Sequence, residues 1–262
     1  MTVTTSEPLR QRALRALDTV VDPELDEPIT DLGFVRSLDL TGDGRVTVHL
    51  RLPTSFCSPN FAYLMASDAK DALTALDGVA SVEVLLDDHH DSDLINRGLA
   101  ADAGYRGTFG HEAEQDLEEL RLTFRRKAHI AATDRALGRL LRAAPNTPGQ
   151  ELYGLVLGDL PDGPATRALL RRRAALGLGT DPADFVLVDE DGARVPPDGI
   201  PARLRFAHSV RVSIEGNVHF CRGLLRTRYP DEADAASGRT LLPLLTADAS
   251  APSSPAPKEN AS

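Results

Sequence analysis

The chain has 262 residues, 42% hydrophobic and 26% charged, enough for one large domain or two small ones with aliphatic cores. A formal net charge of -10 argues against a general nucleic-acid-binding protein, and no apolar run is long enough to cross a membrane. Because the opening residues lack signal-peptide features, we expect a cytoplasmic protein whose two cysteines, Cys57 and Cys221, are free thiols.

The first half of the chain predicts a small α+β unit. Apolar residues at helical spacing predict a helix over 8–20, which Asp22-Pro23 ends because the residue before proline avoids the α region. Alternating apolar residues predict strands over 34–40 and 45–52, joined by the turn at 41–44. A helix over 60–76 and a strand over 79–86 follow. The order α-β-β-α-β predicts a compact sandwich domain over 8–90.

The rest of the chain is predicted in three parts. Residues 91–145 form a helical connector, with helices over 94–103 and 111–144. Residues 146–230 form a smaller C-terminal α+β region of unassigned role, with helices over 165–176 and 217–228 and strands over 185–188 and 207–214. Residues 231–262 are rich in Ala, Ser, Asp and Pro, so we expect a disordered tail.

The strongest chemical signal is Cys57, which lies in a polar turn between a predicted strand and a predicted helix. A helix N-terminus presents free N–H groups and a positive dipole end, and both stabilise a thiolate. The thiolate is the form that binds metal. The alternative is that Cys57 is a small buried hydrophobic residue, since free cysteines are often buried.

Several motifs around Cys57 occur in a characteristic order. They are Asp22-Pro23-Glu24-Leu25, then Asp31-Leu32-Gly33-Phe34-Val35, then Pro53-Thr54-Ser55-Phe56-Cys57-Ser58, and finally Leu76-Asp77-Gly78-Val79. In this pattern residues 8–90 resemble the SufT- and PaaD-like metal–sulfur cluster assembly domains, relatives of the cytosolic iron–sulfur targeting factors. Phe56-Cys57-Ser58 stands where the family usually has Gly-Cys-Pro, and Asp87-Asp88-His89-His90 replaces a Trp-rich segment.

The resemblance implies a function in the assembly or maturation of metal centres rather than an enzymatic activity. Cys57 would hold iron or an iron–sulfur cluster transiently. The partner would be a client metalloprotein, with a di-iron monooxygenase as one candidate, and a homodimer could supply a second thiolate.

Carboxylates near the thiol are the next candidates. Asp22, Glu24 and Asp31 could act as hard ligands beside the soft sulfur. Alternatively, Asp22 ends a helix and Asp31 accepts hydrogen bonds from turn amides. Thr54 and Ser55 are supporting candidates, either as N-cap donors for the next helix or as hydrogen-bond donors to sulfide.

His89 and His90 lie among four aspartates, and imidazole with carboxylate suits iron or zinc. Adjacent side chains of an extended chain point in opposite directions, so we do not expect both rings to hold one ion. The alternative is a solvated loop. Cys221 follows His219 by two residues, a spacing that brings the pair together in a strand but not in a helix.

Two other classes of function remain open. A metal-dependent enzyme could use the acidic loop around His89 and His90. A metal-free adaptor could bind an acidic partner through the basic clusters at 125–129 and 171–173, for which solvated helix faces are the alternative. The chain has no phosphate-binding loop, dinucleotide fingerprint, nucleophile elbow or Cys-x-x-Cys pair, which disfavours nucleotide-dependent, hydrolytic and redox enzymes.

Overall fold

A computed structural model of the chain describes residues 8–110, 117–143 and 147–230. The class is α+β, as predicted: a three-stranded sheet with helices, followed by a helical segment. We call residues 8–110 the N-terminal module and residues 117–228 the helical region. No helix in the described ranges is long and apolar enough to cross a membrane.

The sheet of the N-terminal module has the order β1-β2-β3, with β1 at Val35–Leu40, β2 at Arg45–Arg51 and β3 at Ser81–Asp87. β1 and β2 are antiparallel, whereas β2 and β3 are parallel. A parallel pair requires a crossover connection, and α2 at Pro59–Thr74 provides it. In the β1–β2 turn, Gly44 has φ +83, and a Cβ there would lie 2.7 Å from the Gly78 carbonyl oxygen.

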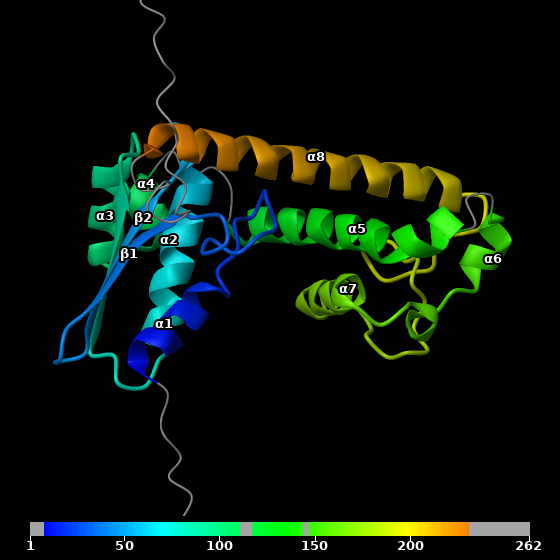
Figure 1. Cartoon of the computed structure of the whole chain (residues 1–262), viewed down its shortest axis with the longest axis horizontal. Coiled ribbons are helices and arrows are strands. Elements are labelled where there is room, and N and C mark those ends of the chain that lie inside the picture. Colours follow the sequence, from blue (N-terminus) through cyan, green and yellow to red (C-terminus); the bar gives the residue numbers. More distant parts are fainter. Residues whose placement is uncertain (1–7, 111–116, 144–146, 231–262) are drawn as a thin grey trace, which may run out of the picture. The chain divides into compact units, whose positions relative to one another are not determined.

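Helices α1 (Leu9–Leu17) and α2 pack on each other, and α2 also packs on β3. The period of two in β2 buries Val46, Val48 and Leu50, as its alternation predicts. Two short helices, α3 (Ser92–Ala100) and α4 (Gly104–Phe109), complete the module, with α3 against β3 (Figure 1).

The helical region contains α5 (Leu117–Ala143), α6 (Gly149–Tyr153), the 3-10 turn η2 (Leu157–Asp159), α7 (Pro164–Ala175) and α8 (Ile200–Arg228). Helix α5 packs against both α7 and α8, and α5 and α8 run side by side (Figure 1). Their aliphatic core includes Leu137, Leu169, Val186 and Ile200. The core of this region is thus built from Leu, Val, Ile and Ala, as the absence of Trp predicts.

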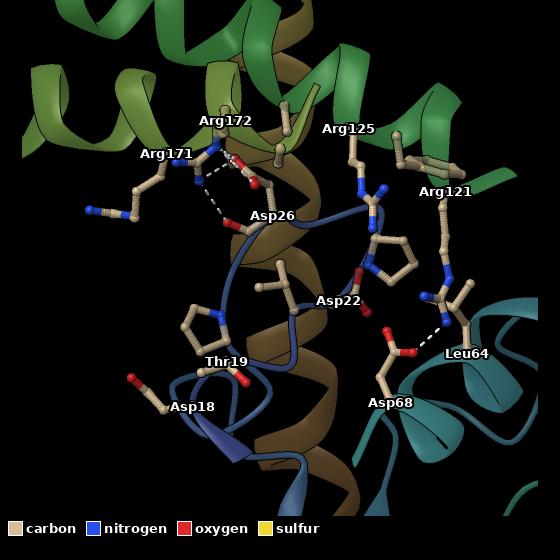
Figure 2. Close-up of a pocket in the computed structure, with 16 residues that line it drawn as sticks. Asp18, Thr19, Asp22, Asp26, Leu64, Asp68, Arg121, Arg125, Arg171 and Arg172 are labelled. Carbon is tan, nitrogen blue, oxygen red and sulfur yellow. Dashed lines mark hydrogen bonds and ion pairs between the residues drawn. The ribbon is translucent and has the colours of Figure 1, made fainter. Parts of the chain in front are cut away.

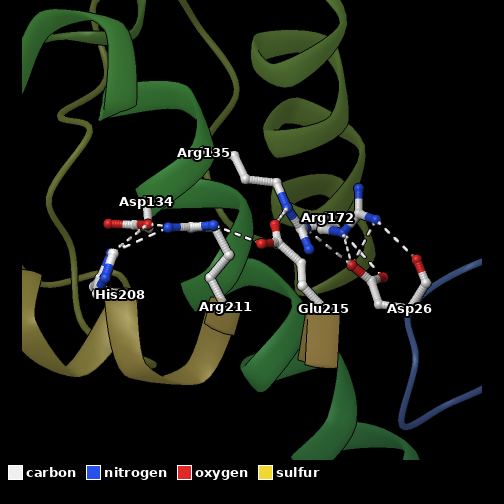
Figure 3. A network of polar contacts seen from close by, with 7 residues as sticks. All are labelled: Asp26, Asp134, Arg135, Arg172, His208, Arg211 and Glu215. Atoms are coloured by element: carbon white, nitrogen blue, oxygen red, sulfur yellow. Dashed lines mark hydrogen bonds and ion pairs between the residues drawn. The ribbon is translucent and has the colours of Figure 1, made fainter. Parts of the chain in front are cut away.

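A polar network joins the helices to one loop of the N-terminal module (Figure 3). Arg172 of α7 donates to both carboxylate oxygens of Asp26, at 3.1 and 2.9 Å. Arg135 of α5 lies 3.8 Å from the same carboxylate and 3.2 Å from Glu215 of α8. Glu215 in turn pairs with Arg211.

Two predicted strands of the C-terminal part are wrong. Residues 207–214 lie within α8, whose buried residues Ala207, Ile214, Val218 and Leu225 follow helical spacing. Val212 is 50% exposed, so the apolar alternation there does not correspond to one buried face. At 185–188 only the two end residues form isolated bridges, Phe185 with Val156 and Val188 with Arg194.

The remaining helices lie close to their predicted positions, including 217–228, which forms the end of α8. The predicted domain limits at 90, 145 and 230 remain predictions. Residues 111–116 of the predicted connector helix and the predicted tail at 231–262 fall outside the described ranges.

Candidate functional site

Cys57 lies in the turn between β2 and α2, just before the N-cap residue Ser58. Its side chain is partly exposed, not sealed among aliphatic groups. The Thr54 hydroxyl oxygen is 3.5 Å from the Cys57 sulfur, and the same oxygen accepts a hydrogen bond from the Phe56 N–H at 3.2 Å. The turn therefore gives the sulfur a polar neighbour and leaves it accessible.

The Cys57 turn is held by His89, which is only 7% exposed. The Asp91 N–H donates to His89 Nδ1 at 3.0 Å, so this nitrogen is the acceptor. The other nitrogen, Nε2, is then the protonated one, and it donates to the Cys57 carbonyl oxygen at 2.8 Å. With both ring nitrogens engaged, His89 positions the Cys57 turn, and binding a metal would break one of these bonds.

His90 also contacts the Cys57 turn, but from the surface. It is exposed, and its ring stacks on Phe56 with the ring centroids 5.9 Å apart. The His90 N–H donates to the Ser55 carbonyl oxygen at 2.9 Å. The segment is a turn rather than an extended chain, so the expectation that His89 and His90 do not share one ion remains a prediction.

Asp22 is a buried carboxylate in the loop that follows α1. Its Oδ1 accepts hydrogen bonds from the N–H groups of Glu24 at 2.9 Å and Leu25 at 2.8 Å. Burial nevertheless raises the pKa of Asp22 to about 6, because desolvation outweighs these two donors. Glu24 is exposed, and its carboxylate accepts a hydrogen bond from Asn217 of α8 at 3.3 Å.

Two local predictions around the turn are wrong. The N-cap of α2 is Ser58, without a side-chain cap hydrogen bond, rather than Thr54 or Ser55. Within the described ranges, the side chain of Asp31 is exposed and has no hydrogen-bond or ion-pair partner. The carboxylate that accepts bonds from turn amides is Asp22, because Asp22 sits at the start of its turn, facing the amides of residues 24 and 25.

Cys221 belongs to the same neighbourhood, which the sequence did not predict. Burial raises the pKa of the Cys221 thiol to about 11, and the charges of Asp22, Cys57 and Glu24 contribute to the rise. These charges act on Cys221 because α8 lies over the loop that carries Asp22. The only signal in the sequence is that the chain has two cysteines, of which Cys221 is the second.

A cavity of about 680 Å³ lies beside the Asp22 loop (Figure 2). The loop contributes Asp22 and Asp26, and the facing helices contribute arginines from α5 and α7. Arg121 pairs with Asp68 and Arg172 with Asp26, so acidic groups already neutralise part of this arginine cluster. Cys57 does not line this cavity.

The donor set fits iron chemistry only in part. Thiolate sulfur is a suitable ligand for iron and iron–sulfur clusters, and carboxylates are harder ligands. In the part of the chain that the structure describes, no group of three or more His, Cys, Asp or Glu side chains could hold a metal ion. The residues present can therefore supply some of the ligands of a metal or cluster but not a complete shell.

Comparison with known proteins gives the family of this arrangement. Residues 10–86 match the model of the iron–sulfur cluster assembly protein family. An uncharacterized protein of Methanocaldococcus jannaschii is 35% identical over 90 residues, which are 34% of this chain and 93% of that protein. The Fe–S protein maturation auxiliary factor YitW of Bacillus subtilis is 35% identical over 78 residues, 30% of this chain and 74% of that protein.

An iron–sulfur cluster carrier protein of Mycobacterium leprae is 38% identical over 79 residues, 30% of this chain. The match covers only 20% of that carrier's own length, so the similarity is to one part of it. The matched segment in this chain contains the Asp22 loop and the Cys57 turn. The chain belongs to the iron–sulfur cluster assembly protein family.

Proposed function

We propose that this protein is an accessory factor that holds iron or an iron–sulfur cluster through Cys57 and passes it to a client metalloprotein. Membership of the family supports a function in cluster assembly or maturation. The observation that carries the finer proposal is the partly exposed Cys57 sulfur in a turn fixed by His89. A fixed and accessible sulfur can meet a second protein without rearrangement of the fold.

The chemistry proposed for Cys57 is ligand exchange. The thiol loses its proton when it binds the cargo, and the resulting thiolate is one ligand of the iron. We propose Asp22 and Glu24 as additional hard ligands that move toward the cargo when it binds, because no three such side chains in the described part of the chain are placed to hold an ion. Because the protein's own ligands are few, thiolates of a client can complete the shell and then displace Cys57.

The supporting residues keep the sulfur in place. His89 binds the Cys57 carbonyl oxygen, and Thr54 places its hydroxyl next to the sulfur. The Ser55 carbonyl oxygen accepts the His90 N–H, which ties the turn to the chain that follows β3. In this proposal His89 is a positioning residue, whereas His90 stays available at the surface.

The proposed partner is an iron-dependent client, and a di-iron monooxygenase is the first candidate to test. The relatives named a carrier and a maturation auxiliary factor support delivery to clients as a mode of action. The helical region, which follows the matched residues 10–86, is the part that we propose contacts the client. A second copy of the chain is an alternative source of the missing ligands.

The test is anaerobic reconstitution with ferrous iron and sulfide, followed by gel filtration and measurement of iron and sulfide per chain. We expect Cys57→Ser to lose most of the retained iron and to fail in transfer to an apo-ferredoxin. Ser58→Ala is the matched control, because Ser58 is adjacent and makes no side-chain cap hydrogen bond. Circular dichroism melting would verify that both variants fold.

If Cys57→Ser retains and transfers iron as well as the unaltered protein does, the proposed mechanism is wrong. Iron that survives Cys57→Ser but is lost from a His89→Ala, His90→Ala double variant would instead favour the metal-dependent enzyme. Capture of the same client by Cys57→Ser, with no retained iron in either protein, would favour the metal-free adaptor.

A further inference from the structure

The face of α8 that carries Cys221 packs against the N-terminal module. A residue four positions further along a helix lies about 40° around its axis, and one eleven positions further about 20°. Asn217, Cys221, Leu225 and Arg228 therefore share one face. Leu225 is 7% exposed, and its side chain lies 3.3 Å from the point where a Cβ on Gly33 would be.

The neighbours of Cys221 on that face contact the two loops that form the candidate site. One turn before Cys221, Asn217 donates to the Glu24 carboxylate at 3.3 Å. Two turns after it, Arg228 donates to the Leu52 carbonyl oxygen at 3.1 Å and to the Asp88 carbonyl oxygen. These contacts place Cys221 between the loop of Asp22 and Glu24 and the segments that flank the Cys57 turn.

Leu52 and Asp88 are close to the Cys57 turn on two sides. Leu52 follows β2 and leads into the turn, and Asp88 precedes the His89 that binds the Cys57 carbonyl oxygen. Burial raises the pKa of the Cys221 thiol, and Cys57 is among the groups that raise it further, in keeping with these contacts. The contacts of Asn217, Leu225 and Arg228 therefore bring the face of α8 that carries Cys221 next to the Cys57 turn, although 57 and 221 are far apart in the chain.

We propose that Cys57 and Cys221 form a two-thiol site for a thiophilic metal ion, with the carboxylates of Asp22 and Glu24 beside it. This inference rests on the proposed function and adds the second sulfur ligand to it. Binding of one divalent ion M²⁺ by two thiols forms two M–S bonds and releases two protons to solvent. The two thiolates then neutralise the ion, and the remaining coordination positions stay open for sulfide, water or client ligands.

The negative surroundings favour such a site. In the metal-free protein burial, and after it the carboxylate charges, oppose ionisation of Cys221, whereas the positive charge of a bound cation would stabilise the thiolate and the carboxylates alike. Two protein thiolates are half of a tetrahedral shell. An ion held this way is bound more firmly than by one sulfur, yet it can still be transferred.

The test is anaerobic titration of the full chain with Co²⁺, whose thiolate-to-metal charge-transfer absorption reports the number of bound sulfurs. We expect Cys57→Ser and Cys221→Ser each to halve this absorption and to weaken Co²⁺ binding by more than about tenfold. The matched control is the double variant Cys221→Ser, Gly223→Cys. Gly223 has open space around it and lies about 160° away on α8, so we expect no recovery there.

The outcomes separate this inference from the proposed function. If Cys221→Ser keeps the full absorption and affinity while Cys57→Ser loses both, the two-thiol site is wrong and the Cys57 mechanism stands. If neither variant weakens binding, both are wrong. Recovery by the relocated thiol would also overturn the two-thiol site, because a thiol on the opposite face cannot reach Cys57.

A second measurement needs no variant and no metal. Dibromobimane becomes fluorescent only when it bridges two thiols, and mass spectrometry of the digested protein identifies the bridged peptides. We expect an intramolecular bridge between Cys57 and Cys221 in the reduced, metal-free chain. Modification of each cysteine separately, without a bridged product, would overturn the proximity on which the inference depends.

Discussion

The N-terminal module and the helical region each bury one histidine, and the surroundings of the two rings differ. His89 is 7% exposed, and both of its ring nitrogens take part in hydrogen bonds around the Cys57 turn. His129 of α5 is 2% exposed, and its Nε2 is a buried atom without a hydrogen-bond partner in the described part of the chain. Both regions therefore bury a histidine, but in the described part of the chain only the ring of His89 makes hydrogen bonds at the candidate site.

The largest effect is expected for His89→Ala. The change removes the donor to the Cys57 carbonyl oxygen and the acceptor of the Asp91 N–H, and it leaves a cavity in a buried position. We expect the free energy of unfolding to fall by about 2–3 kcal/mol. Urea denaturation measures this loss, and the reactivity of Cys57 toward a thiol reagent should rise because the turn is no longer fixed.

His90→Ala is the matched control for that change. His90 is adjacent but exposed, so we expect its removal to change the unfolding free energy by less than about 0.5 kcal/mol. Equal losses in the two variants would mean that the hydrogen bonds of His89 do not hold the turn, and the contrast between the two buried histidines would disappear.

The second effect concerns the connection between the two regions. Asp26→Asn removes the charge that pairs with Arg172 and lies near Arg135. Asp26 has φ 56, a left-handed conformation that Asn also tolerates, so the change should not strain the loop. Burial raises the pKa of Asp26 as it does that of Asp22, but Asp26 has cationic partners, and its neutralisation would leave Arg172 without a charged partner. We therefore expect a loss of about 2 kcal/mol, less than for a fully buried pair because Arg172 is partly exposed.

Asp162→Asn is the control for Asp26→Asn. It breaks the pair with Arg167 on the surface, where both side chains are largely exposed, so no measurable change is expected. If the two changes have the same small effect in thermal denaturation, the network of Figure 3 contributes little to the attachment of the helices.

The third effect is a gain in the free energy of unfolding, expected for Asp22→Asn. Burial raises the pKa of Asp22 to about 6 from 3.8, so the folded state binds its proton more tightly than the unfolded state does. This contribution to stability is full below pH 3.8 and is lost as the pH rises through 6. Asp22→Asn keeps an oxygen for the two turn amides and removes the charge. We expect it to match the unaltered protein near pH 4 and to be about 1–2 kcal/mol more stable at pH 8.

Urea denaturation at several pH values measures this difference. A constant difference between pH 4 and pH 8 would show that Asp22 does not titrate as a buried group. The same variant also tests the two-thiol site. If Asp22→Asn gains stability but loses Co²⁺ affinity, the charge of Asp22 contributes to metal binding at a cost in stability.

The sequence predicted the N-terminal module well because its signals are local. Alternation in β2, the turn before Gly44 and the proline after Asp22 depend on neighbouring residues, and the observed helices and strands start or end within a few residues of their predicted limits. The Cys57 turn was predicted for the same reason. The resemblance in residues 8–90 added the family.

The rest could not be read from local patterns. Apolar residues at Val210, Val212 and Ile214 fit a strand and a helix equally over so short a stretch, and only the longer spacing of buried residues in α8 decides between them. The position of Cys221 beside the Asp22 loop depends on contacts such as Asn217 to Glu24, which join distant parts of the chain. Similarly, the bonds of His89 follow from the tertiary position of the Cys57 turn.

The smallest effect is expected for His129→Leu. The stability contributed by His129 is lost as the pH falls, whereas that contributed by Asp22 is lost as the pH rises. Burial lowers the pKa of His129 to about 4 from 6.5, and the charges of Arg173 and Arg203 lower it further. Its neutral ring therefore contributes stability that is full above pH 6.5 and is lost as the pH falls toward 4. Because Nε2 has no partner in the described part of the chain, Leu should replace the ring at pH 7 with little change. Near pH 4.5 we expect the variant to be more stable than the unaltered protein by about 1 kcal/mol in urea denaturation. A large loss of unfolding free energy at pH 7 would instead indicate that the His129 ring makes a stabilising hydrogen bond, as the His89 ring does. The two buried histidines would then not differ.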